Sequence, residues 1–305
     1  MLSSYIYDPA YFEMPEGAYL GTQYVRVPAN DLGVTRAFTI FTVLRARGGV
    51  AFQLDAHIKR IITSAKIVHM RLPHNTDQLT AIVQQVVGKN FTDSPHENMD
   101  LTVKIMYTGG PEGKNHISQA GLAVLYILVN PYTPPPETVK LVTCTYQRPH
   151  SDVKLNNYVD AIIEYAIAVE SYGQGNVDDV LYTENSPAAN VLECSTSNIF
   201  GVWEKNGEFH IVTPPAEKTL QGITRDVLLN VLSKNLPANF IFAEKDIPLA
   251  NLIEGTTEVL LTSSTGPRNV RSINDEQIGD GKVGPVTTAI IQALDDFQKQ
   301  QCGLI

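Results

Sequence analysis

Three consecutive prolines, Pro134 to Pro136, constrain this chain more than any other feature. Proline fixes the backbone φ angle and has no N–H donor, so a run of three interrupts both helix and strand and forms a stiff, extended connector. The chain has 305 residues, which is long enough for two domains. We therefore predict a first domain over residues 1–130, a linker over 131–137 and a second domain over 138–305.

The half before the prolines mixes strand and helix patterns. Residues 39–45 and 101–107 alternate in the manner of strands, and residues 56–70 and 79–87 carry apolar side chains at helical spacing. Asp55 stands where the first of these helices would begin, and we predict it as the N-cap. This half is predicted to be a small α+β domain.

The half after the prolines is also mixed. Strands are predicted at 139–146, 179–182, 199–203, 209–212 and 258–262, and helices after residue 158, around 227–232 and at 287–298. The pattern by itself predicts only a mixture of α and β.

Composition and charge narrow the class of protein. The hydrophobic fraction of 43% is ordinary for a folded chain, and the net charge of −9 disfavours nonspecific nucleic-acid binding. The longest apolar runs are too short to span a bilayer, and no secretory signal is expected at the amino terminus. The three cysteines are far apart, which fits a reducing compartment and predicts a cytoplasmic protein without a disulfide framework.

Two common kinds of site are not indicated. The seven histidines show no paired ligand spacing, so no metal site is predicted. Ser195 and Ser197 have no histidine partner signature, which disfavours a hydrolase. The glycine-rich run from Thr108 to Gly113 lacks the ending of a phosphate-binding loop and is interpreted as a turn or a substrate-side flap.

One ordered set of residues does indicate a chemistry. Lys154 opens the run to Tyr158, Glu193 opens the run to Asn198, and Gly222 precedes an apolar helix. Pyridoxal 5'-phosphate requires an amine for its aldehyde, a carboxylate for its ring nitrogen and an anion site for its phosphate. Taken singly, the three have simpler explanations: a surface lysine, a solvated acid and a helix cap.

In this order the segments resemble the class IV, or fold-type-IV, pyridoxal-phosphate aminotransferases. This family includes branched-chain aminotransferases, D-amino acid aminotransferases and aminodeoxychorismate lyases. The resemblance runs from about residue 30 to about residue 294, in blocks at 30–45, 57–65, 153–158, 193–200, 220–225, 258–265 and 281–287.

The resemblance implies both a fold and an assembly. The expected fold class is α+β, with a small N-terminal α+β domain and a larger C-terminal domain built around a pseudo-barrel. The family is generally dimeric with active sites near the subunit interface, so a homodimer is implied by the resemblance alone.

The resemblance also implies roles for individual residues. Lys154 would form the Schiff base with pyridoxal 5'-phosphate and later carry the proton of the substrate α-carbon, and Glu193 would face the pyridine nitrogen. Tyr158 would lie near the phenolic oxygen of the cofactor, and Thr265 in a substrate-binding loop. The residues expected to bind the phosphate are Arg60, Gly222, Ile223, Thr224 and Ser264.

The segment expected to select the substrate departs from the branched-chain pattern. Those enzymes commonly carry Phe-Glu-Gly-Ile-Arg, whereas this chain has Thr42 after Phe41 in place of the acid. Arg36 stands where many members have an aromatic residue. We hypothesise that Arg36, helped by Lys104, binds the substrate α-carboxylate beside Phe41; the alternative is a structural arginine.

The leading prediction is therefore an aminotransferase whose small-molecule substrates are an amino acid and a 2-oxo acid. Branched-chain substrates with 2-oxoglutarate come first, and D-alanine or D-glutamate with pyruvate or 2-oxoglutarate second. A lyase that releases pyruvate from aminodeoxychorismate would use the same lysine. A binding or structural protein that has lost activity is the remaining class, and the presence of Lys154, Glu193 and Gly222 argues against it.

Overall fold

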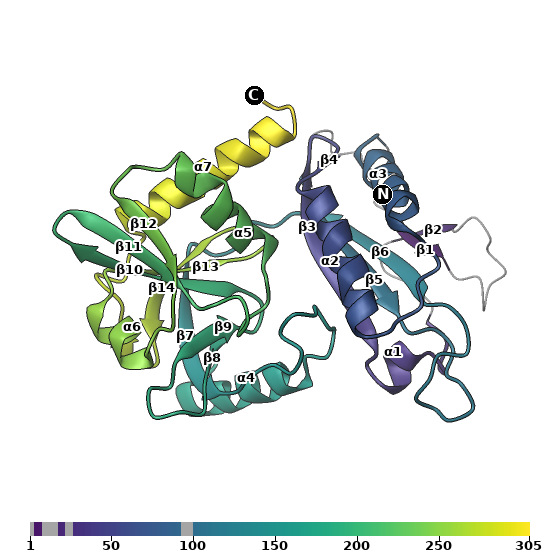
Figure 1. Ribbon diagram of the computed structural model, residues 1–305, viewed down its shortest axis with the longest axis horizontal. Helices are drawn as coiled ribbons and strands as arrows, with labels where there is room; N and C mark the ends of the chain where they lie inside the picture. The colour runs from purple at the N-terminus through teal and green to yellow at the C-terminus, as the bar shows by residue number, and fades with distance from the viewer. Residues whose placement is uncertain (1–2, 8–17, 22–26, 93–99) are drawn as a thin grey trace. The chain divides into compact units, whose positions relative to one another are not determined.

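The computed structural model describes residues 3–7, 18–21, 27–92 and 100–305. The chain forms two compact units (Figure 1). Unit 1 contains Met1–Thr133, Val153–Asn157 and Gln298–Ile305, and unit 2 contains Pro134–Asp152 and Tyr158–Phe297. The first division falls at the proline run, but two stretches that the sequence assigned to the second domain belong to unit 1.

Unit 1 is built on a six-stranded antiparallel sheet in the order β2-β1-β6-β5-β3-β4. Its longest pairing joins β3 to β5, in register from Thr39 opposite Thr108 to Ala46 opposite Leu101. The strands are β1 (Ser3–Tyr7), β2 (Ala18–Gly21), β3 (Thr39–Arg47), β4 (Val50–Ala51), β5 (Leu101–Thr108) and β6 (Val124–Pro131).

Two long helices, α2 (Leu54–Ile67) and α3 (Thr76–Thr92), pack against this sheet (Figure 1). Their apolar stripes include Ile58 and Val83, which are buried in one core cluster with the inward side chains of the strands. The short helix α1 (Leu32–Thr35) is capped by Asp31, whose carboxylate accepts the Gly33 N–H at 2.6 Å.

The start predicted for α2 was wrong. Asp55 lies inside the first turn, and the N-cap is Gln53 in a left-handed conformation with φ of 53°. The reason is that the Phe52 N–H pairs with the Arg45 carbonyl, so the chain must turn sharply before the helix begins. Asp55 still suits its place, because an acid in the first turn interacts favourably with the helix dipole.

The segment around Lys154 is extended and pairs with β3. The Phe41 N–H donates to the Lys154 carbonyl at 3.0 Å, and the Asn156 N–H donates to the Thr39 carbonyl at 2.9 Å. Val153 is fully buried in the core of unit 1. Helix α4 starts at Val159, which confirms the helix predicted after residue 158, and Lys154 lies in the extended segment before it.

Unit 2 is built on a nine-stranded mixed sheet in the order β12-β11-β10-β13-β14-β7-β8-β9, with β15 paired to β14. The central β7 runs parallel to both β14 and β8, which encloses it in the interior of the sheet. The strands are β7 (Thr138–Thr145), β8 (Asp179–Thr183), β9 (Val191–Cys194), β10 (Asn198–Lys205), β11 (Glu208–Thr213), β12 (Phe240–Glu244), β13 (Glu258–Thr262), β14 (Arg268–Ile273) and β15 (Glu276–Gln277).

The helices of this part of the chain are α4 (Val159–Tyr172), α5 (Ile223–Asn230), the 3-10 helix η1 (Leu232–Lys234), α6 (Leu249–Gly255) and α7 (Pro285–Gln301). The buried Glu258 fixes the start of α7, because its carboxylate accepts the N–H groups of Val286 at 2.9 Å and Thr287 at 2.8 Å. A carboxylate at a helix N-terminus satisfies orphan donors and interacts favourably with the helix dipole.

Helix α4 differs from the other helices in what it exposes. Only Ala168 is buried, while large apolar side chains between 41% and 67% exposed line its surface: Val159, Ile162, Ile163, Tyr165 and Ile167. Four of these five positions, 159, 162, 163 and 167, recur at the spacing of a single helix face. None of the helices in the described part of the chain combines the length and apolar character that a bilayer crossing requires.

Candidate active site

The Lys154 amine lies over an aromatic ring in unit 1. Its Nζ is 4.9 Å from the centre of the Phe41 ring, and the Lys104 Nζ is 4.5 Å from the same ring centre. Lys104 also donates to the side-chain oxygen of Asn156 at 3.1 Å, and Asn156 follows Lys154 by two residues. Burial lowers the pKa of Lys104. The structure thus brings three predicted site residues, Lys154, Lys104 and Phe41, into one group.

Arg60 belongs to the same unit and reaches β3 from helix α2. Its Nη2 donates to the Thr42 hydroxyl at 2.6 Å, and that hydroxyl lies 2.7 Å from Nδ1 of His57. Thr42 is fully buried and His57 nearly so. Burial, and then the charges of Arg60 and Lys154, hold the pKa of His57 well below its usual range. The imidazole is therefore neutral at physiological pH.

Glu193 is the buried carboxylate of unit 2. It is only 3% exposed and lies on β9, which the sequence pattern did not predict as a strand. One of its oxygens, Oε2, accepts the Leu220 N–H at 3.2 Å. The other, Oε1, lies 3.3 Å from Nε of Arg148. A solvated loop acid, the simpler explanation for Glu193, is excluded by this burial.

Arg148 is a residue that sequence reasoning missed. Its Nη2 donates to the Ser195 carbonyl at 3.0 Å, and its guanidinium lies 5.5 Å from the centre of the Tyr158 ring. Burial lowers the pKa of Arg148, but the Glu193 carboxylate and the Tyr158 hydroxyl more than offset this and raise it. The only signal in the sequence was a lone arginine six residues before Lys154, which no periodic pattern distinguishes.

Gly222 is the N-cap of helix α5 and has no side chain to cap it. A Cβ at this position would overlap the Asn198 side-chain oxygen, while Nδ2 of Asn198 donates to the Leu220 carbonyl at 2.8 Å. The first N–H groups of a helix have no intrahelical acceptor and point outward, so this end can hold an anion. The predicted helix start at Gly222 is confirmed by the structure.

The turn after β13 is tied to the start of α5. The Thr224 hydroxyl donates to the Ser263 carbonyl at 3.0 Å, so its own hydrogen is engaged there. Within the turn the Ser263 and Thr265 hydroxyls lie 2.9 Å apart, and the Gly266 N–H donates to the Ser263 carbonyl at 3.1 Å. Ser264, between them, is half-buried. The predicted phosphate residues of unit 2 thus come from two segments that the Thr224–Ser263 hydrogen bond connects.

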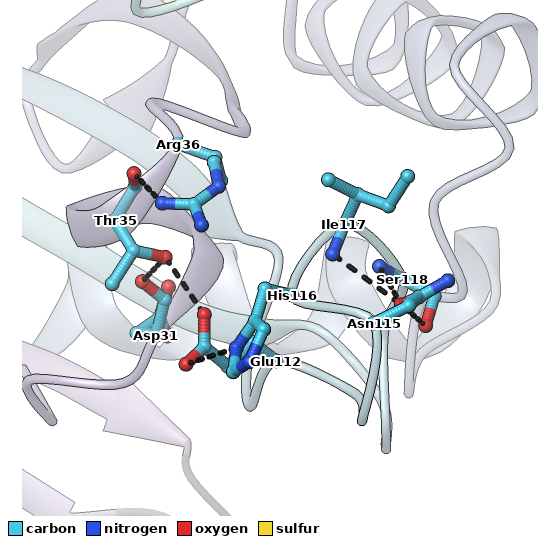
Figure 2. Close-up of polar contacts among 8 residues, drawn as sticks. All are labelled: Asp31, Thr35, Arg36, Glu112, Asn115, His116, Ile117 and Ser118. Carbon is cyan, nitrogen blue, oxygen red and sulfur yellow. Dashed lines mark hydrogen bonds and ion pairs between the residues drawn. The ribbon is translucent and has the colours of Figure 1, made fainter.

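Arg36 lies at the end of helix α1 and is exposed. Its Nη1 donates to the neighbouring Thr35 carbonyl at 2.7 Å, and the Thr35 hydroxyl contacts the Asp31 carbonyl and the Glu112 carboxylate (Figure 2). His116 lies 3.2 Å from the other oxygen of Glu112, in a turn that also carries the exposed Ile117. Lys104, which is predicted to help Arg36, contacts the Phe41 ring and the Asn156 side chain.

These residues fit the chemical requirements of pyridoxal 5'-phosphate. Unit 1 supplies a half-buried amine on an aromatic ring and the Arg60 guanidinium. Unit 2 supplies a buried carboxylate beside an arginine and a helix start at which only glycine has room. Buried ionised groups in a folded protein are paired or hydrogen-bonded, and Glu193 is both.

Residues 39–273 match the family "Amino-transferase class IV". The chain belongs to the class IV aminotransferases. It is an enzyme of that family, whose members bind pyridoxal phosphate. The predicted family is confirmed by this match.

The curated relatives include both branched-chain and D-alanine aminotransferases by name. The chain is 28% identical to the branched-chain-amino-acid aminotransferase-like protein 2 of Arabidopsis thaliana over 96% of this chain and 53% of that protein. It is 26% identical to a D-alanine aminotransferase of Listeria monocytogenes over 91% of this chain and 92% of that protein. The chain thus spans about half the length of the Arabidopsis relative.

A solved structure gives the same fold. The branched-chain aminotransferase of the archaeon Thermoproteus uzoniensis with norvaline superposes with a TM-score of 0.77 at 19% identity, covering 99% of this chain and 95% of that one. At this identity the likeness establishes the fold. The predicted two-domain α+β fold of type IV is confirmed.

Proposed function

We propose that this chain is a pyridoxal-phosphate-dependent aminotransferase that moves an amino group between an amino acid and a 2-oxo acid. The observation that carries the proposal is the Lys154 amine on the Phe41 ring, in a chain of the class IV family. When bound, the cofactor supplies the aldehyde that takes up the amino group and a ring that accepts electrons from the substrate α-carbon.

Each proposed role uses a property of the residue's own surroundings. Lys154 Nζ would bind the cofactor and carry the proton from the substrate α-carbon to the cofactor's carbonyl carbon, because the β3 pairing of its segment fixes the position of this half-buried amine. The Glu193 carboxylate would accept the ring N–H, since Arg148 and the Leu220 N–H keep a negative charge favourable there. The phosphate would be bound by Arg60, Gly222, Ile223, Thr224 and Ser264, with Tyr158 at the phenolic oxygen.

For the substrate we propose a branched-chain amino acid with 2-oxoglutarate as the acceptor. The Arabidopsis relative supports this choice, and the Listeria relative supports a D-amino acid as the second candidate. Arg36 and Lys104 would bind the α-carboxylate, with Phe41 and Thr265 beside the side chain. Arg36 is suited to that role because an exposed guanidinium can turn towards a carboxylate without breaking a buried contact.

We propose that the chain acts as a homodimer. The apolar surface of α4 supports this, because a helix of 14 residues is about 21 Å long and large apolar side chains gathered along it are uncommon on a monomer surface. A second copy of the chain would cover it. Sedimentation velocity should then give twice the chain mass, and Ile162→Asp should shift the protein to the monomer.

The first experiment mixes the purified protein with pyridoxal phosphate and then adds L-leucine, L-glutamate, D-alanine or D-glutamate separately. A visible absorption band that appears in the wild type and is absent in Lys154→Ala supports the cofactor role of Lys154. Conversion of that band by one donor identifies the substrate class and its hand. A band unchanged by all four donors would contradict the aminotransferase proposal for these substrates. Release of pyruvate from aminodeoxychorismate, added without any oxo-acid acceptor, would indicate a lyase.

A further inference from the structure

A chain of hydrogen bonds links helix α2 to strand β3 through the buried Thr42. Arg60 Nη2 lies 2.6 Å from the Thr42 hydroxyl, which lies 2.7 Å from His57 Nδ1. His57 and Arg60 are three residues apart on α2 and therefore project from the same face of the helix. Thr42 lies on β3 and is fully buried.

The direction of this chain follows from its chemistry. A guanidinium can only donate, so the Thr42 oxygen accepts from Arg60 and keeps its own hydrogen for another acceptor. His57 is held neutral, as shown above, so its Nδ1 can accept that hydrogen while Nε2 carries the ring proton. Donor and acceptor then alternate from guanidinium to hydroxyl to imidazole, and bonds arranged in this way polarise one another.

We propose that Thr42 and His57 are positioning residues that hold Arg60 in the orientation needed to bind the cofactor's phosphate. This inference rests on the proposed function, in which Arg60 is a phosphate ligand. The donors of a guanidinium lie in one plane, so fixing one edge with Thr42 sets the direction of the others. A neutral imidazole suits this place, because a protonated one would add positive charge beside Arg60 and Lys154.

A residue with a merely structural role would give a different result from a positioning residue. Loss of a buried hydrogen bond lowers stability wherever it occurs. Only a change in the orientation of Arg60 should weaken the binding of the phosphate and leave the binding of the rest of the cofactor unchanged. Pyridoxal lacks the phosphate, so comparing its affinity with that of pyridoxal phosphate distinguishes the two effects. A hydrogen bond to a charged group corresponds to about a ten- to hundredfold change in an equilibrium constant.

The test measures the dissociation constants of pyridoxal phosphate and of pyridoxal for the full chain by absorbance titration. In Thr42→Val the hydroxyl is replaced by a methyl group of similar size, and pyridoxal phosphate should bind about tenfold or more weakly while pyridoxal binds as in the wild type. Thr42→Ser keeps the hydroxyl and should restore the wild-type value. In an Arg60→Ala background, Thr42→Val should cause no further loss, because the two residues act as one unit.

Thr108→Val is the matched control. Thr108 is another buried threonine of unit 1, and its hydroxyl donates to the buried Asp31 carboxylate at 2.8 Å. This variant also loses a hydrogen bond to a charged group, but it should leave the affinity for both ligands unchanged. If Thr42→Val does not fold, Thr42→Ser and Thr42→Cys form a second pair that differ only in oxygen and sulfur, and the cysteine variant should bind pyridoxal phosphate more weakly because sulfur is the poorer acceptor.

The outcomes separate this inference from the proposed function. If the wild type binds pyridoxal phosphate and Thr42→Val binds it equally well, the positioning role is wrong and the function stands. Equal weakening of pyridoxal phosphate and pyridoxal would also overturn it, since the effect would not act through the phosphate. A wild type that binds neither ligand would overturn the function and this inference together.

Discussion

Replacement of Arg148 by methionine should destabilise unit 2 strongly. Methionine fills a similar volume without charge, so the variant loses the ion pair to Glu193 at 3.3 Å and the hydrogen bond to the Ser195 carbonyl at 3.0 Å. The Arg148 side chain is 13% exposed and that of Glu193 4%, so solvent cannot replace these contacts. Removing one partner of a buried pair costs about 3–5 kcal/mol, most of it from the charge left behind.

The assay can observe unit 2 alone. The chain has a single tryptophan, Trp203, and it lies on β10 of that unit. Urea unfolding followed by Trp203 fluorescence should give a lower midpoint for Arg148→Met at an unchanged slope. Arg271→Met is the control, because the Arg271–Asp178 pair is 3.7 Å long with both side chains more than a third exposed, and such pairs are worth about 0–1 kcal/mol.

A double-mutant cycle tests the cause of the loss. Arg148→Met combined with Glu193→Gln removes both charges, so the double variant should recover part of the stability lost in Arg148→Met alone. A loss below about 1 kcal/mol in Arg148→Met, or a double variant no more stable than Arg148→Met alone, would refute the reasoning.

Other contacts lead to three further predictions. Gly222→Ala should displace Asn198 by overpacking and lower the free energy of unfolding by about 1–3 kcal/mol in the Trp203 assay. Adding Asn198→Ala to the same chain should relieve the overlap, and a Gly222→Ala variant as stable as the wild type would contradict this prediction. Because the pKa of His57 is lowered on folding, the unfolded chain binds more protons below pH of about 6.5, so stability should fall as the pH drops. Between pH of about 7.5 and about 5.5 the wild type should lose more stability than His57→Gln when unfolding is followed by circular dichroism, and equal losses would show that His57 is not held neutral. Arg36→Leu should raise the Michaelis constant for every amino donor with little change in stability, since Arg36 is exposed; an unchanged constant would leave it a structural residue.

Long periodic segments could be predicted from the sequence. Strand β3 was expected at 39–45 and extends from Thr39 to Arg47, and α7 was expected at 287–298 and extends from Pro285 to Gln301. The four-residue β9 could not, because its short apolar run has no period that separates strand from loop. Its position depends on pairing with β8, which lies elsewhere in the sequence.

The candidate site also contains residues that could be predicted from the sequence and one that could not. Lys154, Glu193 and Gly222 could be predicted as candidates because each residue type has a chemical reason to stand where it does in the family's order. His57 could have been found, since it precedes Arg60 by three residues on a helix that the pattern predicts. Arg148 could not, because only the folded sheet brings its guanidinium to Glu193.

The way unit 1 is assembled bears on how the chain folds during synthesis. Val153, which is fully buried in the core of unit 1, follows an excursion, Pro134–Asp152, that belongs to unit 2. Residues 298–305 also belong to unit 1, where the Gln298 side chain accepts from Arg45 at 3.1 Å. When only residues 1–133 have left the ribosome, part of the core of unit 1 is therefore still missing. Both later segments must leave the ribosome before unit 1 is complete. Unit 1 therefore cannot finish folding before unit 2 has been synthesised.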